Sequence, residues 1–543
     1  MKSFGVKVIK ILIVILVISL LTYRPKFCFS ENSLNLSGKY KGYNVILIIL
    51  DALRPDHLSC YSYYKETSSH IDELAQHGII FKNAFSQASY TLPSVVSIFT
   101  SLYPFSHGVN YIYKDKVPER LYTLAQILNI YGYNTVWFGD IRDPHSGGCK
   151  GVLRGFTDKY NVAYKYEPIF NWMTKHTEEP FFITVHSYST HERTFIFNRF
   201  NNKFYNSIPK DVISLLDATI EKSWNNFQND LRNRPDSFYK LLGKDWVEKH
   251  KDNLLQPRSR INWSEINDSI ENEQQVMAIE KFRRRYFDPI FKAHLFNFLP
   301  FLDSSIFESD NILIGGLINY LKKLNLYNKT IIIISADHGN EYMEHGDIGH
   351  GGFLYDESIH IPLITYLPNL IKPISVDELV QSIDMLPTVL DLLAIPIPYQ
   401  TQGISLVGLM EEKDNALINK YIFSRAADGS LSIRSKYWKF IQKPNQKPNK
   451  DLIDSIPWLK SWLENIRNKD KARNNITGEL YDLQKDKYEK NNLIKIKPEI
   501  AEYLKRCLDS KLNSLVQYQK GDSEFMPGLD EETKERIKKT GYW

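Results

Sequence analysis

The sequence predicts an α/β protein whose central sheet is doubly wound, mostly parallel and flanked by helices. Two runs of apolar, β-branched residues, 45–50 and 330–335, are too short for helices and too uniformly apolar for half-exposed strands, so we expect buried strands there. From about residue 44 to residue 398, strand-like and helical patterns alternate, as they do in a doubly wound domain. With 543 residues, of which 43% are hydrophobic, the chain can bury a large core.

An acidic residue comes shortly after the end of each predicted strand. Asp51 follows the first strand, and Asp337 with His338 follows the second. Open α/β sheets bind ligands beyond the carboxyl ends of their strands, so these side chains are expected to face the ligand crevice. The alternative is that each Asp caps a following helix, which is a common role for Asp after a strand.

A third polar group belongs to the segment 89–109. Pro93 suits the first turn of a helix, and residues 94–102 continue in helical spacing. Thr91 is therefore expected just before a helix N-terminus, where backbone N–H groups and the helix dipole favour an anion. Such a hydroxyl can attack a phosphate or sulfate, although a plain Thr cap is the alternative.

Together these residues have the ligand chemistry of one divalent cation. Asp51, Thr91 and Asp337 offer oxygen atoms, and His338 offers an imidazole nitrogen. The imidazole favours zinc or manganese, whereas the three oxygen donors also tolerate calcium. Direct contact with such a cation would lower the pKa of the Thr91 hydroxyl and make it a better nucleophile.

Several ordered segments resemble the sulfatases of the alkaline phosphatase superfamily. They include NVILIILDALRPDHLSCYSY, TLPSVVSIFTSLYPFSHGV and SADHGNEYMEHGDIGHGGFLYDESIHIPLI. The resemblance implies that Asp51, Asp337 and His338 bind the metal together with Thr91, and that Thr91 is the attacking group.

Two further histidines acquire expected roles from the same resemblance. His191 falls where the family has a histidine facing the substrate and leaving group, and His350 falls where a lysine or histidine often touches the transferred anion. Either imidazole can donate to a developing charge or protonate a departing alkoxide. His186 and His345 are weaker candidates for such a role.

The chain also departs from the family pattern. Formylglycine sulfatases make their nucleophile from Cys or Ser within C/S-x-P-x-R, but here Thr91 and Val95 occupy the first and last of these positions. Ala52 replaces a second acidic metal ligand, and Asp140 stands where a lysine is expected. The combination of an acid, Thr, Asp and His resembles the site of phosphoryl-transferring relatives such as phosphoethanolamine transferases and nucleotide phosphodiesterases.

Three functions are open as hypotheses. The first is a metal-dependent hydrolase that cleaves a sulfate, phosphate or phosphonate ester through Thr91. The second is a phosphoethanolamine-type transferase acting on an envelope glycan or lipid, and the third is a non-catalytic binding protein with the sulfatase fold. The expected partner is a sulfated or phosphorylated small molecule, glycan or lipid. A formal charge of +5, from 68 basic and 63 acidic side chains, is too balanced to indicate nucleic acid.

The N-terminus indicates export. Residues 1–10 carry three lysines, and residues 11–21 are apolar except for Ser19, the length of a signal-peptide core rather than of a full membrane span. We therefore expect residues 1–30 to be a signal peptide or a membrane anchor. The protein would then be periplasmic, secreted or attached to the outer face of the cytoplasmic membrane.

The remaining domain organisation is indicated by pattern changes along the chain. The catalytic domain is expected over 41–400, with a helical insertion or lid at 192–299, and residues 521–543 form a tail. A C-terminal α+β subdomain is expected over 401–520, with hairpin strands around the Asp428–Gly429 turn, another strand at ELYDL and a helix over about 498–515. Four cysteines are too few for a disulfide scaffold.

Overall fold

The computed structural model describes residues 34–110, 115–141, 147, 149–162, 166–191, 203–257, 288–444 and 477–518. Two compact units divide the chain, Met1–Leu36 and Ser37–Trp543, and the described helices and strands belong to the second. The expected signal peptide or anchor at 1–30 and the tail at 521–543 lie outside the described residues. Among the described residues, no helix has both the length and the apolar character needed to cross a bilayer. The domain boundaries expected from the sequence stay predictions.

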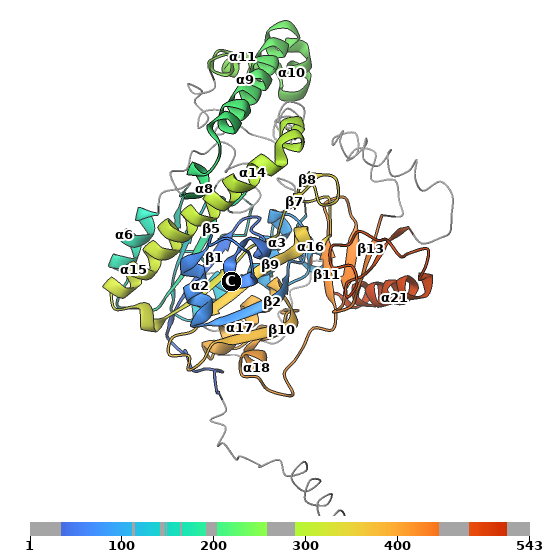
Figure 1. The fold of residues 1–543 in the computed structure, drawn as a ribbon. Helices are drawn as coiled ribbons and strands as arrows, with labels where there is room; N and C mark the ends of the chain where they lie inside the picture. The colour runs from blue at the N-terminus through green and yellow to red at the C-terminus, as the bar shows by residue number, and fades with distance from the viewer. Residues whose placement is uncertain are drawn as a thin grey trace, which may run out of the picture. The chain divides into compact units, whose positions relative to one another are not determined.

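The second unit is organised around an eight-stranded sheet (Figure 1). Only β9 runs antiparallel to its neighbours among the described strands of this sheet. The predicted mostly parallel, helix-flanked sheet is therefore confirmed. In spatial order the strands are β10 (Ile374–Gln381), β2 (Ile79–Phe85), β9 (His360–Tyr366), β6 (Thr330–Ser335), β1 (Asn44–Leu50), β5 (Phe181–Ser187), β3 (Asn134–Phe138) and β4 (Asp158–Tyr160).

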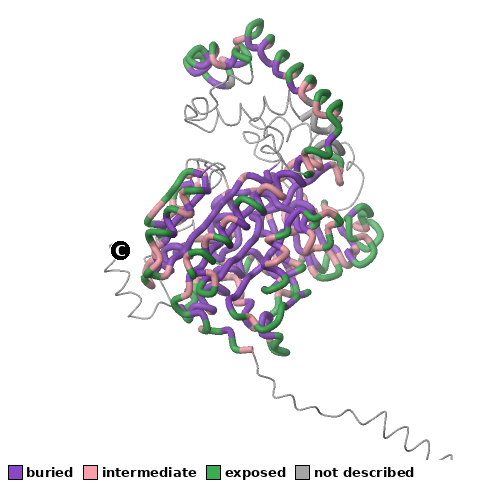
Figure 2. The backbone as a smooth tube through the Cα atoms, turned by 60° about the vertical axis from the view of Figure 1, so that its left-hand side comes forward, coloured by how far each residue is buried: buried purple, intermediate pink, exposed green. Residues whose placement is uncertain are grey.

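The two apolar runs form the centre of this sheet. Every residue of β1, β5 and β6 is buried. In Figure 2 the interior of the fold is mostly purple, the colour of buried residues. β1 pairs in parallel with β5 on one side and β6 on the other, so Ile48 lies beside Val185 and Ile334. Because the three strands run the same way, their carboxyl ends meet at one edge of the sheet.

Helices cover this sheet, and α3 is the one that positions Thr91. α3 begins at Thr91 itself, not one residue later as expected, because Tyr90 is still extended (φ −156°). It ends at Thr100 rather than continuing to 102, since Ser101 adopts a left-handed conformation (φ 57°). Apart from the helices of the insertion and of the small sheet given below, the α-helices of the described residues are α2 (Ser69–Gln76), α3 (Thr91–Thr100), α4 (Pro104–His107), α5 (Leu124–Ile130), α6 (Glu167–Lys175), α15 (Gly316–Lys323), α16 (Asp356–Ile359), α17 (Met385–Leu392) and α18 (Val407–Met410).

Short tight turns of helix connect several of these elements. The 3-10 helices are η1 (Pro55–His57), η2 (Ser59–Tyr61), η5 (Tyr327–Lys329) and η6 (Ser382–Asp384). A π-helical stretch, η4 (Asp310–Gly315), continues α14 directly into α15. A two-stranded hairpin, β7 (Glu341–Tyr342) and β8 (Ile348–Gly349), comes after the Asp337 segment.

The expected insertion is helical wherever the structure describes it. Its elements are α8 (Lys203–Asn206), α9 (Lys210–Asn233), α10 (Pro235–Leu242), α11 (Lys244–Leu254) and α14 (Asp288–Ser309). Helices α9 to α11 share a core that includes Trp224, Phe227, Phe238 and Trp246. Residues 192–202 and 258–287 of the expected insertion lie outside the described residues. A lid role for this insertion stays a prediction.

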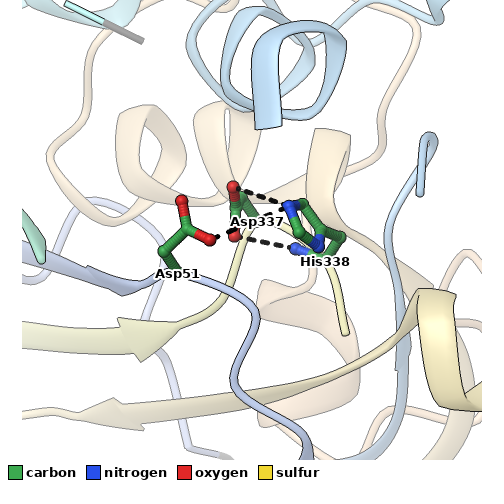
Figure 3. Close-up of side chains that lie close together, drawn as sticks. All are labelled: Asp51, Asp337 and His338. Atoms are coloured by element: carbon green, nitrogen blue, oxygen red, sulfur yellow. Dashed lines mark hydrogen bonds and ion pairs between the residues drawn. The ribbon is translucent and has the colours of Figure 1, made fainter. Parts of the chain in front are cut away.

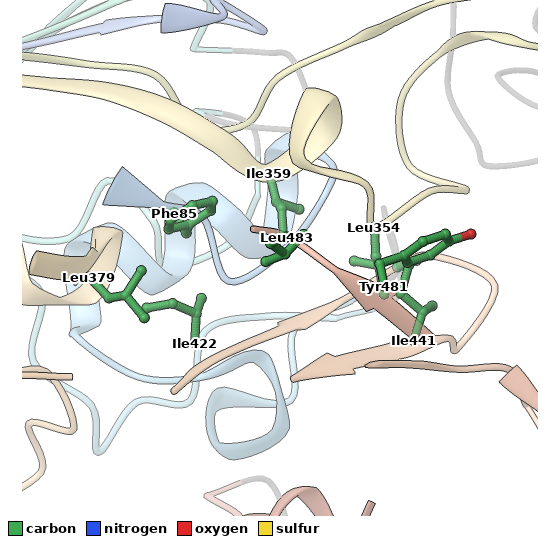
Figure 4. Packing of buried hydrophobic residues seen from close by; sticks show 9 residues of the cluster. Phe85, Leu354, Ile359, Leu379, Ile422, Ile441, Tyr481 and Leu483 are labelled. Atoms are coloured by element: carbon green, nitrogen blue, oxygen red, sulfur yellow. The ribbon is translucent and has the colours of Figure 1, made fainter. Parts of the chain in front are cut away.

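A four-stranded antiparallel sheet with one helix comes after the central sheet in sequence. It consists of β11 (Ile422–Arg425), β12 (Leu431–Arg434), β13 (Trp438–Gln442), β14 (Gly478–Asp482) and α21 (Pro498–Ser514), which confirms the predicted α+β character. Gly429 (φ 88°) closes the predicted turn between the first two strands. Figure 4 shows the apolar cluster that joins the two sheets, in which Phe85 and Leu379 of the large sheet meet Ile422 and Tyr481 of the small one.

Candidate active site

Three separate segments converge at the carboxyl edge of the central sheet. Asp51 follows β1 and Asp337 follows β6, and both side chains are fully buried. Figure 3 shows the two carboxylates facing the imidazole of His338. β2 also ends at this edge, six residues before Thr91 opens α3. The structure brings Asp51, Thr91, Asp337 and His338 together, and their roles as metal ligands and nucleophile stay predictions.

The hydroxyl of Thr91 lies close to both Asp51 and His338. Its Oγ1 is 3.4 Å from Asp51 Oδ2 and 3.1 Å from His338 Nε2. Tyr90, the residue before α3, makes no side-chain cap hydrogen bond to its first turn, so among the described residues the N–H groups of Thr91 and Leu92 are left open to a bound anion. A hydroxyl at a helix N-terminus beside a carboxylate and an imidazole is a geometry suited to attack on an anionic ester.

The tautomer of His338 is set by its backbone neighbour. Its Nδ1 lies 2.7 Å from the carbonyl oxygen of Gly339, and a carbonyl can only accept, so Nδ1 carries the proton. With Nδ1 bound to this carbonyl, the ring turns Nε2 towards the cluster, 3.4 Å from Asp337 Oδ2 and 3.9 Å from Asp51 Oδ1. This is the arrangement that metal-ligating histidines adopt.

The two oxygens of Asp337 have different environments. Oδ1 accepts the backbone N–H groups of His338 at 3.0 Å and of Ala52 at 3.2 Å. Oδ2 is buried and accepts no hydrogen bond from the described residues. Ala52 reaches Asp337 because it adopts a left-handed conformation (φ 59°), which turns the chain directly after β1. The alternative role of Asp51 and Asp337 as helix caps is wrong, since Arg54 precedes η1 and a hairpin comes after Asp337.

Three more histidines surround the cluster. His186 Nε2 lies 3.5 Å from Asp51 Oδ2 and 4.0 Å from Asp337 Oδ2, and His191 Nε2 lies 4.0 Å from Asp51 Oδ1. The ring of His350 is 4.3 Å from that of His338 and 5.0 Å from that of His191, measured between centroids. The structure therefore brings both expected histidines, His191 and His350, to the cluster.

His350 is oriented by a neighbouring amide. Its Nδ1 lies 2.9 Å from Asn340 Oδ1, while Asn340 Nδ2 donates to the carbonyl of Glu341 at 3.0 Å. The amide oxygen therefore accepts, and His350 Nδ1 carries the donated proton. This amide was not anticipated from the sequence, and His186, which lies close to both carboxylates, was only a weaker candidate there.

The donor set fits a divalent cation. Asp51, Asp337 and His338 each offer a ligand atom, and these atoms lie within 4.8 Å of one another. Two buried carboxylates without a counter-charge would be costly, and the buried Asp337 Oδ2 has no hydrogen bond from the described residues to compensate it. A bound cation removes that cost, with Thr91 as the adjacent oxygen.

The sequence matches a known family over most of the region just described. The protein-family model described as Sulfatase matches residues 43–395. The chain belongs to the sulfatase family. It is an ester hydrolase of the alkaline phosphatase-like superfamily that acts on sulfuric esters. A second model, described as N-sulphoglucosamine sulphohydrolase, C-terminal, matches residues 344–476.

Curated relatives are sulfatases. An N-acetylgalactosamine-6-O-sulfatase of Bacteroides thetaiotaomicron is 25% identical over 524 residues, covering 86% of this chain and 92% of the relative. An N-acetylglucosamine-6-O-sulfatase of the same organism is 24% identical and covers 68% of this chain and 71% of the relative. Human arylsulfatase K is 29% identical over 240 residues, 42% of this chain and 39% of the relative.

Solved structures share the fold of this sulfatase. One, in complex with its substrate D-glucosamine-2-N,6-O-disulfate, has a TM-score of 0.58 at 20% identity and covers 89% of this chain and 99% of that one. The phosphonate monoester hydrolase of Agrobacterium radiobacter has a TM-score of 0.56 at 18% identity, covering 87% and 96%. These similarities confirm the architecture of the catalytic domain.

Proposed function

We propose that this sulfatase removes a sulfate group from a hexosamine residue of a glycan by direct attack of Thr91 on sulfur. The observation that carries the proposal is the position of the Thr91 hydroxyl at the start of α3, between Asp51 and His338. The substrate class is supported by the hexosamine sulfatases among the relatives, which cover most of this chain.

The proposed reaction has two steps. In the first, Thr91 Oγ1 bonds to sulfur, the bond from sulfur to the ester oxygen breaks, and Thr91 carries a covalent sulfate. Asp51 Oδ2, at 3.4 Å, accepts the hydroxyl proton, and His191 or His350 protonates the departing sugar alkoxide. In the second, water attacks sulfur and gives a proton to the imidazole that lost one, and the bond from sulfur to Thr91 Oγ1 breaks. Asp51 returns its proton to Oγ1, so inorganic sulfate leaves and the Thr91 hydroxyl is restored.

The metal in this proposal is held by Asp51, Asp337, His338 and Thr91. When bound, a divalent cation neutralises charge on the sulfuryl oxygens and lowers the pKa of the Thr91 hydroxyl. The oxygen-and-imidazole donor set favours zinc or manganese and tolerates calcium. Asp337 is held in position for this task by the N–H groups of Ala52 and His338.

The test compares Thr91 with a second threonine of the same helix. Thr100 is buried in α3, and its hydroxyl donates to the carbonyl of Val96 at 2.7 Å, away from the cluster. Purified full-length protein would be stripped of metal, reloaded with zinc, manganese or calcium, and assayed on 6-O-sulfated hexosamines, aryl sulfate, aryl phosphate and an aryl phosphodiester. Thr91→Ala should lower kcat by about 10³-fold or more, whereas Thr100→Ala should stay close to wild type.

Acid-quenched turnover with subsequent peptide mass spectrometry should find sulfate on the peptide containing Thr91. Full activity of Thr91→Ala would refute the nucleophile assignment. Turnover of phosphodiesters alone would replace sulfate with phosphorus chemistry, and turnover that requires an acceptor alcohol would indicate the transferase. A metal-loaded wild type that is inert on every substrate would indicate a binding protein.

We also propose that the protein is exported through residues 1–30. Support comes from the three lysines ahead of the apolar run at 11–21. Cell fractionation of the full-length protein would test this, with a deletion of residues 2–23 as the comparison. Recovery of the full-length protein in the cytoplasm alone would contradict export.

A further inference from the structure

A second group of metal-ligating side chains lies outside the active-site cluster. Glu341 begins β7, His345 lies in the turn between β7 and β8, and Glu357 lies in α16. One ligand atom from each lies within 4.8 Å of the other two, and His345 Nε2 is 3.4 Å from Glu357 Oε2. None of these three residues belongs to the Asp51 and Asp337 cluster.

Glu341 is the observation that points to a ligand. Its side chain is fully buried, and neither carboxylate oxygen has a hydrogen-bond partner among the described residues. Glu357 Oε2 and His345 Nε2 are also buried, and the two form a 3.4 Å ion pair with each other. Buried polar atoms are almost always hydrogen-bonded in folded proteins, so the two oxygens of Glu341 require a partner of another kind.

The nearest guanidinium does not supply that partner. Arg54 bonds to Asp56, to Glu344 and to the carbonyl of Asn340. Arg54 thus carries one positive charge, whereas four carboxylates lie around it, those of Asp56, Glu341, Glu344 and Glu357. The excess of negative charge is what a cation would neutralise.

We propose that Glu341, His345 and Glu357 bind a second divalent cation, for which Zn²⁺ is the probe. Two carboxylate oxygens and one imidazole nitrogen form a three-ligand set, which a water molecule completes to the four-coordinate geometry of zinc. The assignment does not depend on the reaction proposed for Thr91.

Neighbouring contacts hold the three ligands in place. The ring of Tyr355 stacks on that of His345 with centroids 3.5 Å apart and planes 7° apart. Gly339 donates its backbone N–H to the carbonyl of Ser358 at 2.9 Å, so the segment just before β7 lies against α16. Glu357 also lines a cavity of about 1330 Å³, so the group adjoins this cavity on the Glu357 side.

The expected role of this cation is to fasten the β7–β8 hairpin to α16. The hairpin lies between Asn340 and His350, which are hydrogen-bonded to each other beside the active-site cluster. Closing the hairpin onto α16 would therefore fix the position of His350. Glu341, His345 and Glu357 are positioning residues in this respect, since they do not contact Thr91 or Asp51.

The experiment counts zinc in full-length protein. Metal-free samples of wild type, Glu341→Gln, Asp337→Asn and the double variant would be equilibrated with ZnCl₂, desalted and analysed by inductively coupled plasma mass spectrometry. Asp337→Asn should keep one zinc per chain that the double variant lacks, and Glu341→Gln should hold one zinc fewer than wild type. Glu412→Gln is the control for loss of a carboxylate elsewhere, because Glu412 is exposed and pairs with Lys372 outside both ligand groups, and it should bind zinc like wild type.

Thermal unfolding provides a readout that does not depend on activity. Zinc should raise the Tm of Asp337→Asn but not that of the double variant, and Glu357→Gln should reproduce the effect of Glu341→Gln if the latter folds poorly. A folded Asp337→Asn protein that binds no zinc would overturn the proposal, and so would a Glu341→Gln protein with the zinc content of wild type. Failure of the Thr91 chemistry would instead leave these zinc counts unchanged.

Discussion

The buried imidazole of His107 should make the stability of this protein depend on pH. His107 ends α4, is fully buried, and lies against the helix that carries Thr91. The backbone N–H of Val109 donates to its Nδ1 at 3.0 Å, so the other nitrogen, Nε2, carries the proton and donates to Ser97 Oγ at 3.1 Å. Both contacts fit the neutral ring, and a second proton on Nδ1 would break the bond to Val109.

The size of the effect is set by the pKa. Burial lowers the pKa of His107 from 6.5 to about 3, so the folded state stays neutral while the unfolded chain takes up a proton below pH 6.5. Stability from this group is complete above pH 6.5 and is lost as pH falls towards 3. At about 1.4 kcal/mol per pH unit, the free energy of unfolding should fall by about 2 kcal/mol between pH 7 and pH 5.

Urea unfolding at pH 7 and pH 5, monitored by circular dichroism, would measure this loss. His107→Asn keeps an oxygen that can accept from Val109 but does not titrate, so its free energy of unfolding should fall by about 2 kcal/mol less than that of wild type over this range. Ser97→Ala is the matched control, because it removes one hydrogen bond, at a cost of about 1 kcal/mol, and keeps the imidazole. Equal pH dependence in wild type and His107→Asn would refute the reasoning.

Two further predictions concern stability. Lys439 is fully buried, and its Nζ lies 2.9 Å from Asp356 and 2.8 Å from Glu489. Lys439→Met should therefore lower the free energy of unfolding in urea by about 3 to 5 kcal/mol, and adding Glu489→Gln should recover part of this loss. An unchanged urea midpoint in Lys439→Met would contradict this prediction. A methyl group on Gly155 (φ 89°) would lie 2.1 Å from a backbone nitrogen in the first turn of α5, so Gly155→Ala should cost about 3 kcal/mol by thermal unfolding. Gly132→Ala, at a similar φ of 86° but with open space around it, should cost about 1 kcal/mol, and equal losses would show that the contact is unimportant.

The sequence predicted the parts of the site that depend on chain direction. An apolar run with Asp directly after it identifies a buried strand and its carboxyl end, and parallel strands bring such ends together, so Asp51 and Asp337 could be paired without coordinates. The same pattern could not distinguish a ligand from a helix cap, because both place Asp after a strand. The distinction lies in the segment after each Asp, and neither segment continues into a helix that the Asp caps.

Contacts that depend on strand register were beyond the sequence. His186 lies inside β5, where an imidazole near the end of an apolar run looks like an ordinary strand residue. It reaches Asp51 because β5 pairs with β1 in a register that places His186 beside Ile49, two residues before Asp51. The closeness of Glu357 to Glu341 and His345 likewise depends on how α16 packs on the β7–β8 hairpin, and Glu341 lies sixteen residues before Glu357 in the chain. Local patterns carry no information on either arrangement.

The charge of the cluster gives a physical reason for a threonine at position 91. Many members of the family have a second acidic ligand where this chain has Ala52, whose contribution here is a backbone N–H to Asp337. In the metal site proposed above, the carboxylates of Asp51 and Asp337 would just balance the charge of a divalent cation instead of exceeding it. A cation that is not over-neutralised attracts an additional oxygen more strongly and lowers its pKa further. In the proposed reaction the ordinary hydroxyl of Thr91 needs that help more than a pre-activated nucleophile does, so the residues at positions 52 and 91 are consistent with the same proposed chemistry.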